Sequence, residues 1–259
     1  MRSSELRSMV AEAHRAIERA GLVSLTFGNV SGVDRQAGVF VIKPSGVPCR
    51  DVGPEDLVAV ALDDGRVVEG SGRPSTDTPT HRFLYREFAE IGGVVHAHSA
   101  FASAWAQAGR AIPVLGTTHA DYFRGPVLVS RPLSRAEIDG DYEWETGRVI
   151  AETIREHRRT AEDSPSVLVR SHGPFSWGAS AERAVEAAIA VETIATMAWQ
   201  TLTLDSGAPA VPPELLARHF DRKHGRTAYY GQLPGRDGDG GAREITAATA
   251  DPTHGGGPR

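Results

Sequence analysis

The sequence predicts a single-domain α/β protein, and two features of its pattern lead to that fold class. Amphipathic helical stretches alternate with short runs of β-branched and other apolar residues along most of the chain. No linker or internal repeat divides residues 1–232, whereas residues 233–259 are rich in Gly, Asp and Thr and almost free of apolar residues. We therefore expect one folded domain over residues 1–232 and a disordered C-terminal tail over residues 233–259.

Composition narrows the functional classes. The chain has 259 residues, a net charge of −5 and 40% hydrophobic residues, as in an ordinary globular protein. No cluster of Lys and Arg interleaves with aromatic residues, which argues against nucleic acid as a partner. No run approaches the roughly 20 apolar residues of a membrane span. The single cysteine, Cys49, excludes an internal disulfide and fits a reducing compartment, so we expect a cytoplasmic protein without a membrane partner.

The first half of the chain is expected to start with a helix and continue with strands. Apolar residues recur every three or four positions from Leu6 to Ile17, and Gly21 is placed to end this helix. Strands are expected over residues 39–42, 57–62 and 66–69, the last two joined by a turn that contains Gly65. The polar loop 72–77 then leads into a helix for which Thr78 is a plausible N-cap, and this helix should stop at Gly92–Gly93.

The second half is expected to continue the alternation. A short Ala-rich helix should end near Gly109, and Ser134 with Glu137 forms a capping-box pattern. Helices are further expected over residues 142–158, 180–204 and 214–220, and strands over 94–98, 126–129 and 167–169.

Histidines at the ends of predicted strands indicate a metal site. His96 and His98 are two residues apart on a predicted strand, so their side chains should point to the same face. His172 follows a second buried strand, from which its side chain could return to the same pocket. Three imidazoles with an open position would suit a divalent cation, but a pair of unrelated histidines or a capping histidine would give the same pattern.

Three other groups have a chemical and a plain interpretation. Asp77 precedes a helix, so it could cap that helix or serve as a fourth ligand or nearby acid/base. Asp121 lies in a segment rich in hydroxyl groups, where it could shuttle protons or be a solvated turn residue. Tyr230 closes the ordered part of the predicted domain and could act as a general acid or simply pack.

Three small polar pairs lie on three different loops: Gly28–Asn29, Ser45–Gly46 and Ser75–Thr76. Hydroxyl groups and exposed backbone N–H groups on loops can hold a phosphate, and Lys43 could supply positive charge. None of the three pairs matches a known nucleotide-binding fingerprint.

Taken together, these segments resemble the class II aldolase/adducin family. The resemblance covers residues 5–232 in order. It rests on seven segments: residues 28–31, 42–47, 77–81, 91–99, 116–123, 172–175 and 223–232. Two departures stand out, since Thr76 takes the place of an expected serine and the tail is longer than is usual in the family.

The resemblance implies a three-layer α/β/α domain with a central, largely antiparallel sheet, assembled as a homotetramer with active sites between subunits. It also implies a zinc ion, or another divalent metal such as Mn²⁺ or Co²⁺, and a small phosphorylated sugar as substrate. The implied metal residues are Asp77, His96, His98 and His172. The implied substrate-binding residues are Gly28, Asn29, Ser45, Gly46, Ser75 and Thr76. Asp121 and Tyr230 fall at the family's acid/base positions, contributed across the subunit boundary.

Within the family, the resemblance points to epimerases that invert C4 of a ketopentose 5-phosphate, converting L-ribulose 5-phosphate to D-xylulose 5-phosphate. The hydrogen on C4 is not acidic, so inversion requires cleavage and re-formation of the C3–C4 bond, with charge stabilised by a metal. A class II sugar-phosphate aldolase is the nearest alternative, and a non-catalytic adducin-like interaction module is a remote one.

Overall fold

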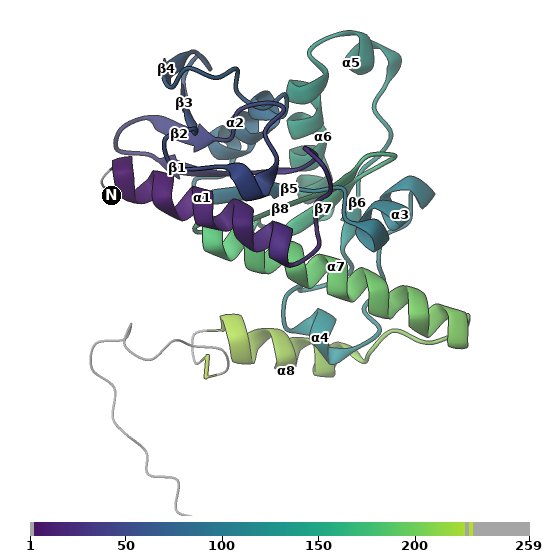
Figure 1. The fold of residues 1–259 in the computed structure, drawn as a ribbon. Helices are drawn as coiled ribbons and strands as arrows, with labels where there is room; N and C mark the ends of the chain where they lie inside the picture. Colours follow the sequence, from purple (N-terminus) through teal and green to yellow (C-terminus); the bar gives the residue numbers. More distant parts are fainter. Residues whose placement is uncertain (1–2, 226–227, 230–259) are drawn as a thin grey trace, which may run out of the picture.

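The computed structural model describes residues 3–225 and 228–229 (Figure 1). The helices are α1 Ser3–Arg19, η1 Cys49–Asp51, α2 Thr78–Glu87, α3 Ala100–Ala108, α4 Thr117–Ala120, α5 Arg135–Asp139, α6 Tyr142–Glu156, α7 Ala181–Leu204 and α8 Pro213–His224. The strands are β1 Asn29–Asp34, β2 Val39–Ile42, β3 Val58–Ala61, β4 Val67–Glu69, β5 Gly93–His96, β6 Leu128–Val129, β7 Ser166–Val169 and β8 Gly173–Gly178. Among the described helices, none is long and apolar enough to cross a membrane.

The strands form one eight-stranded sheet in the order β4-β3-β2-β1-β5-β8-β7-β6. Neighbouring strands run antiparallel throughout, except for the parallel pair β6 and β7 at one edge. The expected α/β class with a central, largely antiparallel sheet is therefore confirmed. β5 and β8 lie side by side in the middle of the sheet, and this pairing determines where the candidate site forms.

Helices cover both faces of this sheet, which gives three layers (Figure 1). Because side chains alternate along a strand, neighbouring residues enter different cores. Val95 packs with residues of α1 and α7 on one face. Val94 packs with residues of α2 and α6 on the other face. Both faces of the sheet are apolar, so the central strands are buried on both sides. Their polar residues lie at strand ends or form hydrogen bonds in the interior.

A third apolar cluster lies between β7 and helices α3 and α7. Residues of α3 and α7 pack there with Ile112, Phe123 and Val127 from the segments that flank α4. α8 packs against α4, and both lie across α7 from the sheet (Figure 1). The sequence pattern predicts an irregular segment at residues 116–123. The structure instead has the short helix α4 there, and Asp121 directly follows its last residue.

Most of the expected elements are confirmed, and the exceptions lie near the site. The capping box of Ser134 and Glu137 is present, and the Ser180 side chain accepts from the backbone of α7. The N-cap of α2 is Asp77 rather than Thr78, and α2 ends at Glu87, before the expected Gly92–Gly93. The sequence pattern also missed β8, because a strand that begins Gly-Pro lacks the apolar run on which strand prediction depends.

Two predictions lie outside the described residues. One is the disordered tail over residues 233–259, and the other is the acid/base position of Tyr230.

Candidate metal and substrate site

Three histidines meet at the central strands of the sheet. His96 ends β5, His98 follows two residues later, and His172 lies in the turn between β7 and β8. The pairing of β5 with β8 sets His96 opposite Phe175, which brings the turn beside the end of β5. One ligand atom from each of the three histidines lies within 4.8 Å of the others. The Nε2 atoms of His96 and His98 are 3.0 Å apart, so both rings point the same way even though His98 lies past the strand end.

Contacts on the outer side of the rings orient two of these histidines. Nδ1 of His96 lies 3.0 Å from the carbonyl oxygen of Pro174, and a carbonyl only accepts, so this nitrogen carries the proton. The ring of Phe175 stacks on His96 with centroids 4.0 Å apart. Nδ1 of His172 lies 3.3 Å from the Tyr142 hydroxyl. The Nε2 atom of His96 faces the cluster, close to Nε2 of His98.

The ionisation of the cluster suits metal binding. Burial, together with the nearby His96 and His98, lowers the pKa of His172 to about 4. Burial and His96 also lower the pKa of His98. Neutral imidazole is the form that binds metals, and His98 is exposed, so one side of the cluster is open. Three imidazole nitrogens that face one another beside an open position fit a divalent cation that keeps a coordination site for substrate.

Asp77 lies beside the cluster without being part of it. Although it is the N-cap residue of α2, its side chain makes no capping hydrogen bond. Instead, Oδ2 accepts from Nδ2 of Asn29 at 2.6 Å. Burial raises the pKa of Asp77, but electrostatic interactions with His96 and His81 and the Asn29 hydrogen bond outweigh this, so the pKa lies below its usual value. An ionised carboxylate is therefore held next to the histidines, and the capping interpretation of this side chain is wrong.

The three polar loops predicted from the sequence converge on this carboxylate. Asn29 opens β1, pairs with His96 in the sheet and also donates to Ser75 Oγ at 3.1 Å. The backbone N–H of Ser45 donates to the carbonyl oxygen of Arg73, and the backbone N–H of Ser75 donates to the carbonyl oxygen of Lys43. These two hydrogen bonds join the second and third loops as short antiparallel segments. Ser45, Gly46 and Thr76 remain exposed at the mouth of this arrangement.

Gly28 lets the first loop approach the histidines closely. Its φ of +82° is in the left-handed region, and a Cβ there would lie 2.5 Å from Val23 Cγ1 and 3.0 Å from the His96 carbonyl oxygen. Any larger residue would push the loop away from β5. Phe27, the preceding residue, stacks on His98 with ring centroids 5.9 Å apart.

Lys43 is buried rather than presented on the surface. Its Nζ donates to the carbonyl oxygens of Thr26 at 3.0 Å and Val47 at 2.6 Å. Burial lowers its pKa, while Cys49 and Asp77 nearby act in the opposite direction. Lys43 thus ties the first loop to the second through these two hydrogen bonds.

The structure does not bring Asp121 to the histidine cluster within one chain. Its carboxylate accepts from Arg222 Nε at 3.0 Å and Nη2 at 2.9 Å, and it lies 3.0 Å from His219 Nδ1. Burial raises the pKa of Asp121, and the hydrogen bonds from Arg222 and His219 lower it more, so the net shift is downward. These partners belong to α8, on the opposite side of α7 from β5 (Figure 1).

Sequence analysis missed four polar residues around these two clusters. His219 and Arg222 lie three residues apart on one face of α8, but the sequence pattern predicts this helix only over residues 214–220, so Arg222 falls outside it. Tyr142 gave no signal beyond being the first residue of a helix. His81 is fully buried, and its Nδ1 lies 2.7 Å from Ser31 Oγ, which in turn contacts the Tyr85 hydroxyl. The positions of Tyr142 and His81 follow only from the tertiary structure.

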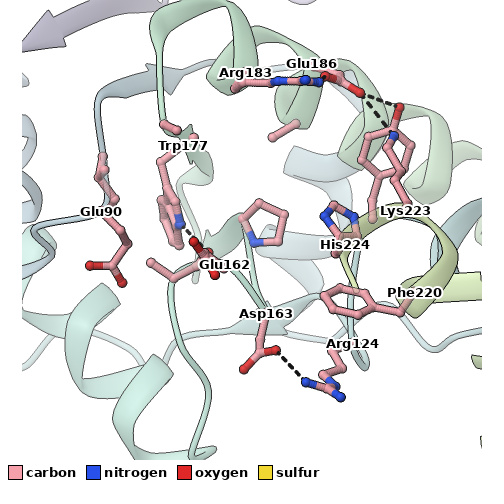
Figure 2. A pocket seen from close by; sticks show the side chains of 17 residues that line it. Glu90, Arg124, Glu162, Asp163, Trp177, Arg183, Glu186, Phe220, Lys223 and His224 are labelled. Atoms are coloured by element: carbon pink, nitrogen blue, oxygen red, sulfur yellow. Dashed lines mark hydrogen bonds and ion pairs between the residues drawn. The ribbon is translucent and has the colours of Figure 1, made fainter. Parts of the chain in front are cut away.

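A separate cavity of about 450 Å³ lies between α7, α8 and the loop before β7, and it contains none of the three histidines (Figure 2). Several of its charged side chains pair with one another. Glu186 accepts from Arg183 and Lys223, and Asp163 pairs with Arg124. Its charges are therefore largely compensated, and among the described residues that line it there is no cluster of metal-binding groups.

Comparison with known proteins identifies the family of this chain. The model of the class II aldolase and adducin N-terminal domain matches residues 8–199. An L-ribulose-5-phosphate 4-epimerase of Salmonella paratyphi A is 49% identical over 228 residues, which cover 88% of this chain and 99% of the relative. The corresponding epimerase of Salmonella typhi matches equally well.

Solved structures agree at the level of the fold. An L-fuculose 1-phosphate aldolase superposes with a TM-score of 0.70 at 22% identity, covering 84% of this chain and 97% of its own. The L-fuculose-1-phosphate aldolase of Thermus thermophilus has a TM-score of 0.59 at 27% identity, covering 81% of this chain and 100% of its own. The family is metal dependent, in keeping with three histidines that could hold an ion. The chain belongs to the class II aldolase and adducin family.

Proposed function

We propose that this protein is a metal-dependent L-ribulose-5-phosphate 4-epimerase that converts L-ribulose 5-phosphate to D-xylulose 5-phosphate. The observation that carries the proposal is the meeting of three imidazoles with a carboxylate and three polar loops at one end of β5. The named activity of relatives 49% identical over most of the chain supports the substrate. The cytoplasm is the proposed location.

The chemistry requires cleavage of a carbon–carbon bond. A base takes the proton of the C4 hydroxyl, the C3–C4 bond breaks, and its electron pair passes to C3 to give an enediolate and glycolaldehyde phosphate. After the aldehyde turns over, the bond re-forms on its other face and the C4 oxygen regains a proton. A divalent cation held by His96, His98 and His172, with zinc as our proposal, would stabilise the charge of the enediolate.

The residues around the histidines would bind and orient the sugar. Asn29 Oδ1 is buried with no partner among the described residues, so it can accept a hydrogen bond from a substrate hydroxyl. The exposed Ser45, Gly46 and Thr76, together with Ser75, would contact the phosphate, and the ammonium of Lys43 would add positive charge. Gly28 would allow the backbone to approach the substrate. Asp77 would accept a proton or hydrogen bond beside the metal.

The proton transfers at C4 need groups on both faces of the aldehyde, and we assign them to Asp121 and Tyr230. Because Asp121 lies apart from the histidines of its own chain, this assignment requires a second subunit. We therefore propose a homotetramer with active sites between neighbouring chains. Exposed apolar side chains on α7, including Met197, Trp199 and Leu204, support such an assembly.

The direct test of function is incubation of the purified protein with L-ribulose 5-phosphate and measurement of D-xylulose 5-phosphate. Activity should disappear with a chelator and return with added Zn²⁺, Mn²⁺ or Co²⁺. Release of free glycolaldehyde phosphate and dihydroxyacetone as the main products would favour an aldolase instead. Absence of turnover with this sugar phosphate, in protein that holds its metal, would refute the proposed substrate.

A complementation experiment tests the shared active site. His96→Ala and Asp121→Asn chains should each be inactive, but each retains the half-site that the other lacks. Dissociating and reassembling an equal mixture should restore about one quarter of wild-type activity if each site takes these residues from two chains. A mixture that stays inactive although light scattering shows mixed tetramers would contradict the interface site.

A further inference from the structure

Tyr142 touches the histidine cluster, although none of the chemistry above uses it. It is the first residue of α6, and its hydroxyl lies 3.3 Å from Nδ1 of His172. The two rings are nearly parallel, with centroids 6.3 Å apart and an interplanar angle of 24°. The start of α6 is held in place by α2, because Thr80 Oγ1 donates to the carbonyl oxygen of Glu143 at 2.5 Å. The tyrosine is thus fixed beside the histidine by the helix that also follows Asp77.

The chemistry of a histidine ligand gives this contact a purpose. A neutral imidazole carries one proton, so the nitrogen that binds metal is unprotonated only when the other nitrogen holds the proton. For His96, the carbonyl oxygen of Pro174 fixes the proton on Nδ1. His172 lies in a turn, and the partner of its Nδ1 is the phenol oxygen of Tyr142, which can accept an N–H.

We propose that Tyr142 is a positioning residue for the metal site. Its hydroxyl accepts the Nδ1–H of His172, which fixes the tautomer and the ring orientation that present Nε2 to the cation. This inference rests on the metal site of the proposed function. Removal of the hydroxyl leaves the ring free to rotate and to carry its proton on the wrong nitrogen, which weakens metal binding without changing the three ligands.

The test compares Tyr142→Phe with Tyr122→Phe. Both changes remove one hydroxyl, and the Tyr122 hydroxyl donates to Glu186 at the separate cavity, 3.1 Å away. Competition with a chromophoric chelator should show zinc affinity about 10–100-fold weaker for Tyr142→Phe, and unchanged for Tyr122→Phe. The visible absorption of the Co²⁺-loaded protein should change only in Tyr142→Phe. Circular dichroism and melting temperature check that both variants fold.

Each outcome separates this inference from the proposed function. Wild-type affinity and an unchanged Co²⁺ spectrum in Tyr142→Phe would overturn the positioning role. Tyr142→Leu provides a second check, since it should match Tyr142→Phe if the hydroxyl is what acts. Loss of affinity only in Tyr142→Leu would assign the residue to ring packing and overturn the inference. A wild-type protein that binds no metal would instead refute the proposed function itself.

Discussion

The histidine cluster and the Asp121 cluster are both built from titratable side chains, but they are completed in different ways. The histidines turn their free nitrogens toward one another, and one of the three rings is exposed. Asp121 is instead saturated within its chain, because Arg222 binds both carboxylate oxygens and His219 lies beside one of them. The first cluster is arranged to receive a ligand, whereas the second is arranged to keep one carboxylate charged and fixed.

This difference predicts which property of the protein a substitution in each cluster should change. A change in the histidines removes the ligand-binding capacity of the chain and leaves the α4–α8 contact intact. A change at Asp121 should leave metal binding intact and remove one hydrogen-bond acceptor from Arg222 and from His219. Measurements of metal content, catalysis and stability on variants of the two clusters therefore distinguish their roles.

The largest effect is expected from His96→Ala. Removing a ligand from the centre of the cluster should reduce bound metal to a small fraction and epimerisation by roughly 10³-fold or more, because the charge of the enediolate loses its stabilisation. Metal analysis and a coupled assay for D-xylulose 5-phosphate measure both. The control is His157→Ala, which changes an exposed histidine at the opposite end of α6 from Tyr142. Full metal content in the His96 variant would contradict the site.

A selective loss of proton transfer is expected from Asp121→Asn and from Tyr230→Phe. Each should fold, assemble and keep its metal, yet epimerise about 10²-fold or more slowly, as is typical when a general acid or base is removed. Asp163→Asn is a matched control, since this aspartate also pairs with an arginine, Arg124. Near-wild-type epimerisation in both test variants would mean that Asp121 serves only to hold α8.

Substitutions in the loops beside the histidines should affect substrate binding and protein stability to different extents. Asn29→Ala removes a buried amide with an unused acceptor, so KM for the sugar phosphate should rise about tenfold, while loss of its hydrogen bonds to Asp77 and Ser75 should lower the melting temperature by less than Lys43→Ala does. Lys43→Ala should raise KM and also lower the melting temperature, because Nζ ties two loops together. Steady-state kinetics and thermal unfolding of the two variants check this contrast. An unchanged KM in both would remove these loops from the substrate site.

The smallest effect concerns pH and the Asp121 cluster. The pKa of Asp121 is lowered in the folded protein, so the ion pair contributes stability above the unfolded pKa of about 3.9 and loses it as pH falls through the folded value. The melting temperature of Asp121→Asn should thus lie below that of the wild type near neutral pH, and the two should converge in acid. A difference that stays constant with pH would assign the stabilisation to hydrogen bonding rather than to charge.

The sequence was sufficient for features that depend on local pattern. Helix and strand periodicity predicted the α/β class, and the spacing of His96 and His98 predicted that their rings point the same way. It was insufficient wherever pairing between distant segments decides the outcome. Strand β8 has no apolar run and exists because β5 and β7 flank it. The location of Lys43 and the contact of Tyr142 with His172 likewise depend on which loops meet, which no local pattern records.

The pairing of β5 with β8 also makes the histidine cluster depend on the correct register of these two strands. A slip by one residue would exchange the faces of β8 and move the turn that carries His172 away from His96. Chains trapped with such an error could retain nearly all of their secondary structure and still lack a three-histidine cluster. The amount of metal bound by a refolded sample would then measure the fraction of molecules with the correct strand register. Circular dichroism does not measure this fraction.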